Sequence, residues 1–275
     1  MVTLSETDRR AYEANGYVTP QAPLPERLFA RMYEGVQRLL EDNPNVRPEQ
    51  LVGAHVKSGG NTTSGVRGND ILLECAHDPW LLDLVEGVIG PDIIHWGSQV
   101  FCKPGGDGMA IPWHQDGQYW PIRPLASVTV WVAIDASNVE NGCLRVIPGS
   151  HRRGLLKHGV SHEAALALNQ AIEDGIDESM ANDVELEAEQ VSLHHVNIIH
   201  GSNANRSAKR RAGWAIRYMP ATSLFDRAIP PTNLTDTQVV DYASRPIWLV
   251  RGVDRAGNDF RTGHVADRHE PRAAC

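Results

Sequence analysis

Paired cysteines are the first feature that this sequence lacks. Its four cysteines, Cys75, Cys102, Cys143 and Cys275, are widely separated and include no Cys-x-x-Cys pair. A zinc knuckle and a disulfide framework both need closely placed or paired cysteines, so neither is predicted. We expect the thiols to be reduced and mostly structural.

Basic charge and long apolar runs are also scarce. The formal net charge is -8 at pH 7, whereas a surface that binds nucleic acid needs clustered lysine and arginine side chains. No apolar run reaches the roughly 18 residues that a membrane helix requires, and the N-terminus lacks the basic, then apolar pattern of a signal peptide. The sequence therefore predicts a cytoplasmic protein with neither a nucleic-acid nor a membrane partner. It does not indicate an oligomeric state.

The first third of the chain has helical patterning. Residues 3–6, Thr-Leu-Ser-Glu, have the form of a capping box and should start a short helix that Gly16 ends. An apolar stripe predicts a second helix over about 26–41, and a third helix is expected over about 79–89. The segment 47–70 is rich in Gly, Asn, Ser and Thr and is predicted to be a loop.

After Pro91 the pattern changes from helical to alternating. Five segments have the period of β-strands and are separated by turn residues; they are 93–101, 127–134, 143–147, 190–199 and 211–218. Short strands at this spacing predict a sandwich or a jelly roll. The interruption at 154–189 should hold an Ala-rich and Leu-rich helix and then an acidic stretch, which is either a solvated surface or a lid. One further edge strand is expected at 247–250.

The most informative stretch is Ile111-Pro112-Trp113-His114-Gln115-Asp116-Gly117-Gln118-Tyr119-Trp120. Side chains two residues apart in a strand point to the same face, so the His114 imidazole and the Asp116 carboxylate should converge. Two histidines and one carboxylate on one side of an ion are the ligand set of open iron(II) oxygenase sites. Taken alone, a His-x-Asp triplet is also common as a surface pair at a strand end.

Three histidines in the segment 190–202 compete to complete such a site. His200 ends an apolar strand just before a turn, where a jelly roll exposes side chains at the mouth of its barrel, and it is the preferred ligand. His194 has the same strand parity and could line the pocket deeper in, whereas His195 should face the other way. Beyond the turn, Arg211 could return beside His200, where a guanidinium can hold a carboxylate through two parallel hydrogen bonds.

Together these motifs resemble the phytanoyl-CoA dioxygenase family of iron(II)- and 2-oxoglutarate-dependent oxygenases. The residues that carry the resemblance are His114-Gln115-Asp116, then Asn141-Gly142-Cys143-Leu144 running into Pro148-Gly149-Ser150-His151, and finally His200-Gly201-Ser202 followed by Arg211. The resemblance extends from Asn15-Gly16-Tyr17 to about Tyr218. It implies a mainly β fold with flanking helices, namely a double-stranded β-helix or cupin-like jelly roll. We expect a single domain over 1–275, with a helical part over 1–92, a jelly-roll core over 93–220 that contains the insert 154–189, and a C-terminal extension over 221–275.

The resemblance also implies roles for individual residues. It makes His114, Asp116 and His200 the iron ligands, and it makes Arg211, with Ser202 beside it, the partner of the far carboxylate of 2-oxoglutarate. Gln99 and Trp131 lie on strands where the family adds co-substrate contacts. Four further residues either bind the primary substrate or serve the fold: Trp113, Tyr119 and Trp120 could instead pack the barrel rim, and Arg217 could instead form a salt bridge on the sheet.

The activity implied is hydroxylation of an aliphatic C–H bond in a small organic metabolite, such as a secondary metabolite, with consumption of O2 and 2-oxoglutarate and release of succinate and CO2. The metal would carry the oxidation, while the protein supplies geometry and a dry cavity. Related halogenases lack the carboxylate ligand, so Asp116 favours hydroxylation over chlorination. Desaturation, cyclisation and epimerisation use the same cofactors and stay open. A metal-dependent hydrolase and a non-catalytic jelly-roll binding protein are the alternatives of a different class.

Overall fold

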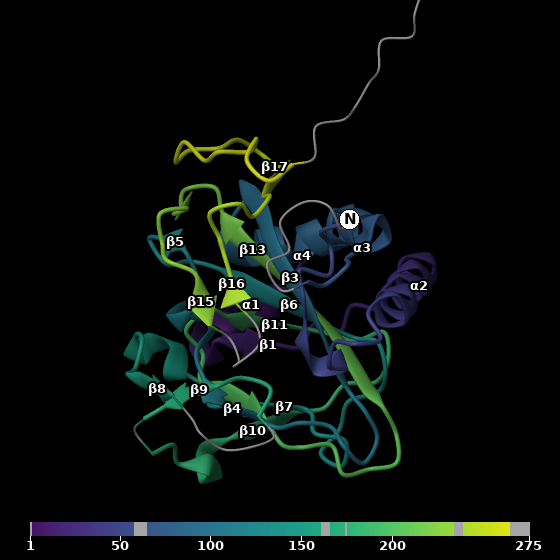
Figure 1. The fold of residues 1–275 in the computed structure, drawn as a ribbon. Helices are drawn as coiled ribbons and strands as arrows, with labels where there is room; N and C mark the ends of the chain where they lie inside the picture. The colour runs from purple at the N-terminus through teal and green to yellow at the C-terminus, as the bar shows by residue number, and fades with distance from the viewer. Residues whose placement is uncertain (1, 58–64, 161–165, 174, 234–238, 265–275) are drawn as a thin grey trace, which may run out of the picture.

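A larger and a smaller antiparallel sheet build the core of the protein, and helices cover the outer face of the larger one (Figure 1). The computed structural model describes residues 2–57, 65–160, 166–173, 175–233 and 239–264, to which the statements below refer. This arrangement is the predicted jelly roll with flanking helices. No helix in these described ranges is long and apolar enough to cross a membrane.

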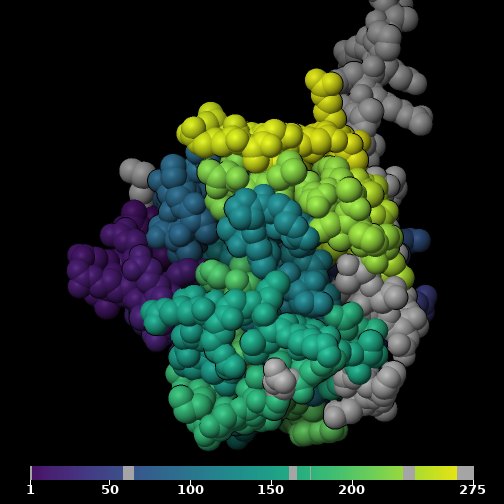
Figure 2. Space-filling view, turned by 90° about the vertical axis from the view of Figure 1, so that its left-hand side faces the viewer, coloured from purple at the N-terminus to yellow at the C-terminus, as the bar shows by residue number. Residues whose placement is uncertain are grey.

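The larger sheet contains seven strands. Its order is β1 (Tyr17–Val18), β11 (Val191–His195), β6 (Val128–Ala133), β13 (Arg211–Pro220), β3 (Ile93–Lys103) and β17 (Trp248–Arg251), and β2 (Leu51–Val52) also pairs with β3. The edge strand predicted at 247–250 is therefore confirmed as β17. It lies in the yellow C-terminal segment, which forms a strip along the upper edge of the face shown in Figure 2.

The smaller sheet contains four short strands, in the order β10 (Asn182–Val184), β7 (Leu144–Val146), β12 (His200–Ser202) and β4 (Ile111–His114). The prediction of one continuous strand over 190–199 is wrong, because β11 ends at His195 and the chain then turns. The backbone N–H of Ile198 donates to the carbonyl of His195 at 3.0 Å in this turn. His194 and His200 consequently lie in different sheets, and the parity argument that linked them does not apply.

Four α-helices precede β3: α1 (Glu6–Asn15), α2 (Glu26–Asp42), α3 (Asp70–Ala76) and α4 (Pro79–Ile89). The capping box of α1 begins at Ser5 and not at Thr3 as predicted. The Ser5 hydroxyl accepts from the Asp8 N–H at 3.0 Å, and the Asp8 carboxylate accepts from the Ser5 N–H at 3.2 Å. Gly16 ends the helix as predicted, with a left-handed φ of 79°.

Shorter elements fill the connections. They are the 3-10 turns η1 (Pro48–Gln50), η2 (Asp116–Gln118), η3 (Ser150–Arg153) and η4 (Glu178–Met180), and the strand pairs β5 (Ile122–Arg123) with β14 (Leu224–Phe225), β8 (His158–Val160) with β9 (Gln170–Ile172), and β15 (Thr232–Asn233) with β16 (Val239–Val240). The helix predicted early in the insert 154–189 is not found in the described part. Residues 166–173 contain β9 instead, and residues 161–165 lie outside the described residues.

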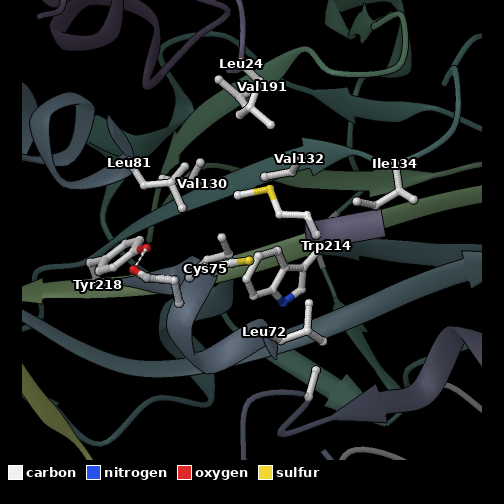
Figure 3. Close-up of a cluster of buried hydrophobic side chains, with 14 of the residues drawn as sticks. Leu24, Leu72, Cys75, Leu81, Val130, Val132, Ile134, Val191, Trp214 and Tyr218 are labelled. Carbon is white, nitrogen blue, oxygen red and sulfur yellow. Dashed lines mark hydrogen bonds between the residues drawn. The ribbon is translucent and has the colours of Figure 1, made fainter. Parts of the chain in front are cut away.

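The main hydrophobic core lies between the larger sheet and the helices. Trp214 and Tyr218 project from β13 toward α3 and α4, where they meet Leu72, Cys75 and Leu81 (Figure 3). The Tyr218 hydroxyl donates to the carbonyl of Ala76 at 2.6 Å, which ties the end of α3 to the sheet. Burial of such large aromatic side chains is a dominant source of stability. Cys75, Cys102 and Cys143 are buried free thiols, as predicted, and Cys275 lies outside the described residues.

The buried ring of His95 connects β3 with β17 and with the end of α3. The rings of His95 and Trp248 stack with centroids 5.6 Å apart, and His77 Nε2 lies 3.1 Å from His95 Nδ1. Burial lowers the pKa of His77 to about 4 and lowers the pKa of His95 well below its usual value. Both rings are therefore neutral in the folded protein at neutral pH.

These lowered pKa values make the free energy of unfolding depend on pH. An unfolded histidine titrates near pH 6.5, so the unfolded chain binds more protons than the folded one as the pH falls toward about 4. Stability is then lost over this window. We expect His77→Gln, which retains a hydrogen-bonding side chain, to make the loss between about pH 6.5 and 4.5 shallower by roughly 2 kcal/mol. Urea unfolding of both proteins across this range would measure the difference, and identical slopes would contradict it.

Candidate metal centre

Three side chains from the smaller sheet and its edge converge on one point. His114 is the last residue of β4, Asp116 opens η2 and His200 is the first residue of β12. Because β4 and β12 pair His114 directly with His200, the two ring centroids are only 4.1 Å apart. One ligand atom from each of the three residues lies within 4.8 Å of the other two, and all three side chains are buried. Within the described ranges, no other group of His, Cys, Asp or Glu side chains meets this condition.

The orientation of the two imidazoles fits a metal ion. His114 Nδ1 lies 2.8 Å from the carbonyl of Pro112, and His200 Nδ1 lies 3.0 Å from the carbonyl of Ile198. A carbonyl oxygen can only accept, so each Nδ1 carries the proton and each Nε2 has a free lone pair. This second hydrogen bond is the usual way in which a protein fixes the tautomer of a metal-binding histidine.

The protonation states also suit a divalent cation. Burial lowers the pKa of His114 and, more strongly, that of His200, so both are neutral ligands. Burial alone would raise the pKa of the Asp116 carboxyl, but the neighbouring imidazoles of His194 and His200 outweigh it and the pKa is lowered. His194 Nε2 lies 3.8 Å from Asp116 Oδ2. The centre thus presents two neutral imidazoles and one carboxylate, which is the donor set of an open iron(II) site.

A pocket of about 460 Å³, here called the arginine-211 pocket, opens on one side of the centre. Arg211 is 3% exposed; it donates from Nη2 to the carbonyl of Gly142 at 2.7 Å, and its guanidinium carbon lies 5.5 Å from the ring centroid of Trp131. The Ser202 hydroxyl, also in the lining, accepts from Lys103 Nζ at 2.7 Å. Arg211 therefore lines this pocket directly, and the Lys103 amine lies behind Ser202, outside the lining.

Gly213 leaves room for Trp131 in the wall of the arginine-211 pocket. A Cβ built at Gly213 would overlap the indole ring of Trp131, which lies across β13 at this point. The close approach of an aromatic ring to the backbone explains a glycine in the middle of a long strand. Trp131 in turn packs against the Arg211 guanidinium. Gly213 therefore influences the position of Arg211 indirectly, by leaving room for the indole ring.

A second pocket, of about 500 Å³, opens on the other side of the centre and is called here the aromatic pocket. Its walls include Trp96, Tyr119 and Trp120, and Arg217 lies with its guanidinium carbon 5.2 Å from the ring centroid of Trp120. His114 and Asp116 line both pockets, and so do Phe101 and Arg217. The metal centre therefore lies where the two pockets adjoin.

The structure brings most of the predicted site residues into these two pockets. His194, Ser202, Trp131 and Arg211 line the arginine-211 pocket, and Tyr119, Trp120, Gln99 and Arg217 line the aromatic pocket. Gln99, predicted beside the co-substrate, is absent from the residues that line the arginine-211 pocket. Its amide donates to the carbonyl of Glu49 at 3.3 Å, and its oxygen accepts from Arg217 at 3.4 Å.

Trp113 is not brought to the metal centre. It precedes His114 in β4, so strand alternation directs it to the opposite face. There the Arg145 guanidinium carbon lies 5.2 Å from its ring centroid, and the residue lines an outer hollow instead. His195 faces away from the centre, as predicted, with its ring near Tyr12 and His151.

Sequence reasoning missed two buried cations. Lys103 is fully buried at the end of β3, two residues beyond the predicted strand; extending the alternation from Gln99 would have placed it on the inner face. Burial, and then the nearby charge of Arg211, lower the pKa of Lys103 to about 6. Arg245 lines the aromatic pocket from an irregular segment, where no periodic pattern could have identified it.

Comparisons with known proteins agree with this geometry. The sequence model of the phytanoyl-CoA dioxygenase family (PhyH) matches residues 12–213. The chain is 28% identical over 235 residues to a probable phytanoyl-CoA dioxygenase of Caenorhabditis elegans, which covers 78% of this chain and 75% of that protein. Among solved structures, a non-heme monooxygenase, ThoJ in its apo form, has a TM-score of 0.66 at 26% identity and covers 90% of this chain and 84% of its own. CytC3 with Fe(II) and alpha-ketoglutarate has the same fold, with a TM-score of 0.61 at 24% identity and coverage of 93% and 91%.

We expect Asp116→Ala to weaken binding of a divalent metal by at least about 100-fold, because removal even of a supporting group outside the ligand set costs 10- to 100-fold. Titration of the metal-free protein with Co(II), followed by visible absorption, measures this affinity. Asp183→Ala, which removes an exposed carboxylate from β10 of the same small sheet, is the control and should bind normally. Equal affinity in the two variants would exclude Asp116 as a ligand.

We expect Gly213→Ala to lower the free energy of unfolding by about 1–3 kcal/mol, because the new methyl group must displace Trp131 from a packed wall. Gly175→Ala is the matched control, since a Cβ there meets nothing within 4 Å. Urea unfolding of the two variants should therefore separate them. If both are as stable as the unmodified protein, the wall is not packed as described.

Proposed function

The chain belongs to the phytanoyl-CoA dioxygenase family and is an iron(II)- and 2-oxoglutarate-dependent dioxygenase, and from this premise we propose that it hydroxylates an aliphatic C–H bond of a small organic molecule. The observation that carries the proposal is the placement of a buried His–Asp–His group where two pockets adjoin, one of which contains Arg211. One pocket would take the co-substrate and the other the molecule that is oxidised.

We assign the iron to Nε2 of His114, Nε2 of His200 and the carboxylate of Asp116. When bound there, the iron would activate O2 and supply the oxidising power for the C–H bond. The chain's own contribution is to hold three ligands on one side of the ion and to keep them in the right protonation state. The hydrogen bonds from the two Nδ1 atoms to Pro112 and Ile198 do this for the imidazoles.

We assign the arginine-211 pocket to 2-oxoglutarate. Arg211 would hold the carboxylate that points away from the metal, with the Ser202 hydroxyl beside it, since a guanidinium binds a carboxylate through two parallel hydrogen bonds. Burial lowers the pKa of Arg211 to about 10 and, together with the Arg211 charge, lowers that of Lys103 to about 6. An anion bound to Arg211 in this pocket would relieve the unfavourable burial of its positive charge, which suits a dicarboxylate.

Asp116 supports hydroxylation as the outcome. It fills the third protein ligand position, and the related halogenases lack that carboxylate. Desaturation, cyclisation and epimerisation share the cofactors and differ only in the fate of the oxidised substrate. A hydrolase would have no use for a buried arginine at the end of a chamber beside the metal, and a simple binding protein would have no use for the complete ligand set.

Anaerobic titration of the iron(II)-loaded protein with 2-oxoglutarate tests this function. A weak visible charge-transfer band should appear when the keto acid chelates the iron. In Arg211→Ala the affinity for 2-oxoglutarate should fall by about 2–5 kcal/mol, because a buried charge pair is broken.

The neighbouring residue provides the control. Arg210 faces outward and bonds Asp135 at 2.8 Å and 2.9 Å, so Arg210→Ala should leave the band and the 2-oxoglutarate affinity unchanged. If iron binds to the unmodified protein and no band forms, the co-substrate assignment is wrong. An unchanged affinity in Arg211→Ala would reject the role of that residue alone.

A further inference from the structure

Two arginines reach the aromatic pocket without forming a direct ion pair. Arg217 comes from β13 on the inner face of the larger sheet, and Arg245 comes from the segment between β16 and β17. Arg245 is only 4% exposed. Neither guanidinium forms an ion pair with any acid of the described chain, and the buried Nε of each has no hydrogen-bond partner there.

The remaining contacts of these arginines do not balance their charge. Arg217 donates to the neutral amide oxygen of Gln99 at 3.4 Å and lies over the ring of Trp120. Burial is the main cause that lowers the pKa of Arg245, and the nearby charge of Arg217 adds to it; Tyr242 and the more weakly acting Asp241 oppose this shift without reversing it. An enclosed guanidinium without a counter-ion is costly, because its hydration is lost and no opposite charge replaces it.

The metal centre and the co-substrate leave this positive charge in place. Among the residues that the structure describes, Asp116 is the one acid in the lining of the aromatic pocket. Iron(II), Asp116, the two carboxylates of 2-oxoglutarate and Arg211 are together formally neutral. Arg217 and Arg245 are therefore left over; Arg217 reaches both pockets, and Arg245 lines the aromatic pocket alone.

Aromatic side chains form much of the remaining wall of the aromatic pocket. Trp96 and Trp120 meet edge to face with ring centroids 4.6 Å apart, and Tyr119 and Tyr242 complete the aromatic lining. Such walls bury hydrocarbon or ring surface, while a few convergent polar groups fix the orientation of a ligand. Here the convergent polar groups are the two arginines.

Building on the proposed function, we infer that the primary substrate is a small organic anion, whose carboxylate or phosphate group binds between Arg217 and Arg245 while its apolar or aromatic body lies against Trp96 and Trp120. Carboxylate and phosphate share the planar, bidentate recognition that a guanidinium offers. The anionic end would fix which carbon of the body faces the metal. The arginines would thus act as specificity-determining residues for the reaction.

Three probes with the same aromatic body test the inference: 3-phenylpropanoate, 2-phenylethyl phosphate and the neutral 3-phenylpropanamide. Their binding is measured by isothermal titration calorimetry in the anaerobic protein loaded with iron(II) and 2-oxoglutarate, and again in the metal-free protein. We expect at least one anion to bind about 10- to 100-fold more tightly than the amide, as hydrogen bonds between charged groups require. The preferred anion identifies the head group.

Substitution of the two arginines shows whether they cause the preference for the anion. Arg245→Gln and Arg217→Gln, each checked for an unchanged circular dichroism spectrum, should remove most of the preference for the anion and leave the amide affinity as it was. Arg255→Gln removes a positive charge from the same C-terminal extension, where Arg255 pairs with Asp92 on the surface, and should change neither affinity.

The outcomes separate this inference from the proposed function. Equal binding of the anions and the amide, or no binding of either anion at millimolar concentration, overturns the inference whatever the iron does. Loss of the 2-oxoglutarate band in Arg245→Gln, with the probe affinities unchanged, also overturns it, because Arg245 would then serve the co-substrate. A missing band in the unmodified protein instead rejects the proposed function, and the metal-free titrations still test the anion site.

Discussion

The direct pairing of His114 with His200 across β4 and β12 is the constraint on which the site depends. A slip of one residue in this ladder would turn one imidazole to the opposite face of the small sheet. Gly201 helps to fix the register, because a Cβ there would meet the carbonyl of Ile111 at 2.9 Å. The turn after His195 carries the chain from the larger sheet to the smaller one, so the position of His200 is tied to the end of β11.

The two faces of strand β13 have different roles: one packs in the hydrophobic core and the other lines the pockets. Trp214 and Tyr218 pack outward against the helices, whereas Arg211 and Arg217 point inward to the pockets. A strand that alternates large apolar and cationic side chains would not be stable alone. The outward aromatic residues anchor it strongly enough to hold two charged groups inside the barrel.

The sequence predicted that His114, Asp116 and His200 lie together with Arg211 nearby, and the structure brings them together because their spacing reflects local geometry: His114 and Asp116 are two residues apart, and Arg211 stands on the strand after His200. Their roles stay predictions. Sequence reasoning missed α3, whose seven residues are too few for a clear helical period, and Arg245, whose position depends on how the irregular tail packs on the sheet. The Ala-rich stretch misled because composition alone does not distinguish a helix from a surface hairpin. The domain divisions and the cytoplasmic location stay predictions.

The net charge of the chain is negative, whereas the charged side chains that line the arginine-211 pocket and the aromatic pocket are mostly positive. The chain carries a formal charge of -8, which argues against a nucleic-acid partner, yet Arg211, Arg217 and Arg245 line the two pockets on either side of the Asp116 carboxylate. A site enclosed by low-dielectric walls is governed by the charges that line it and far less by the total on the surface. The empty fold therefore carries the cost of several desolvated cations. Any anion that offsets this cost binds the folded state selectively, so substrate recognition and stability are thermodynamically linked in this protein.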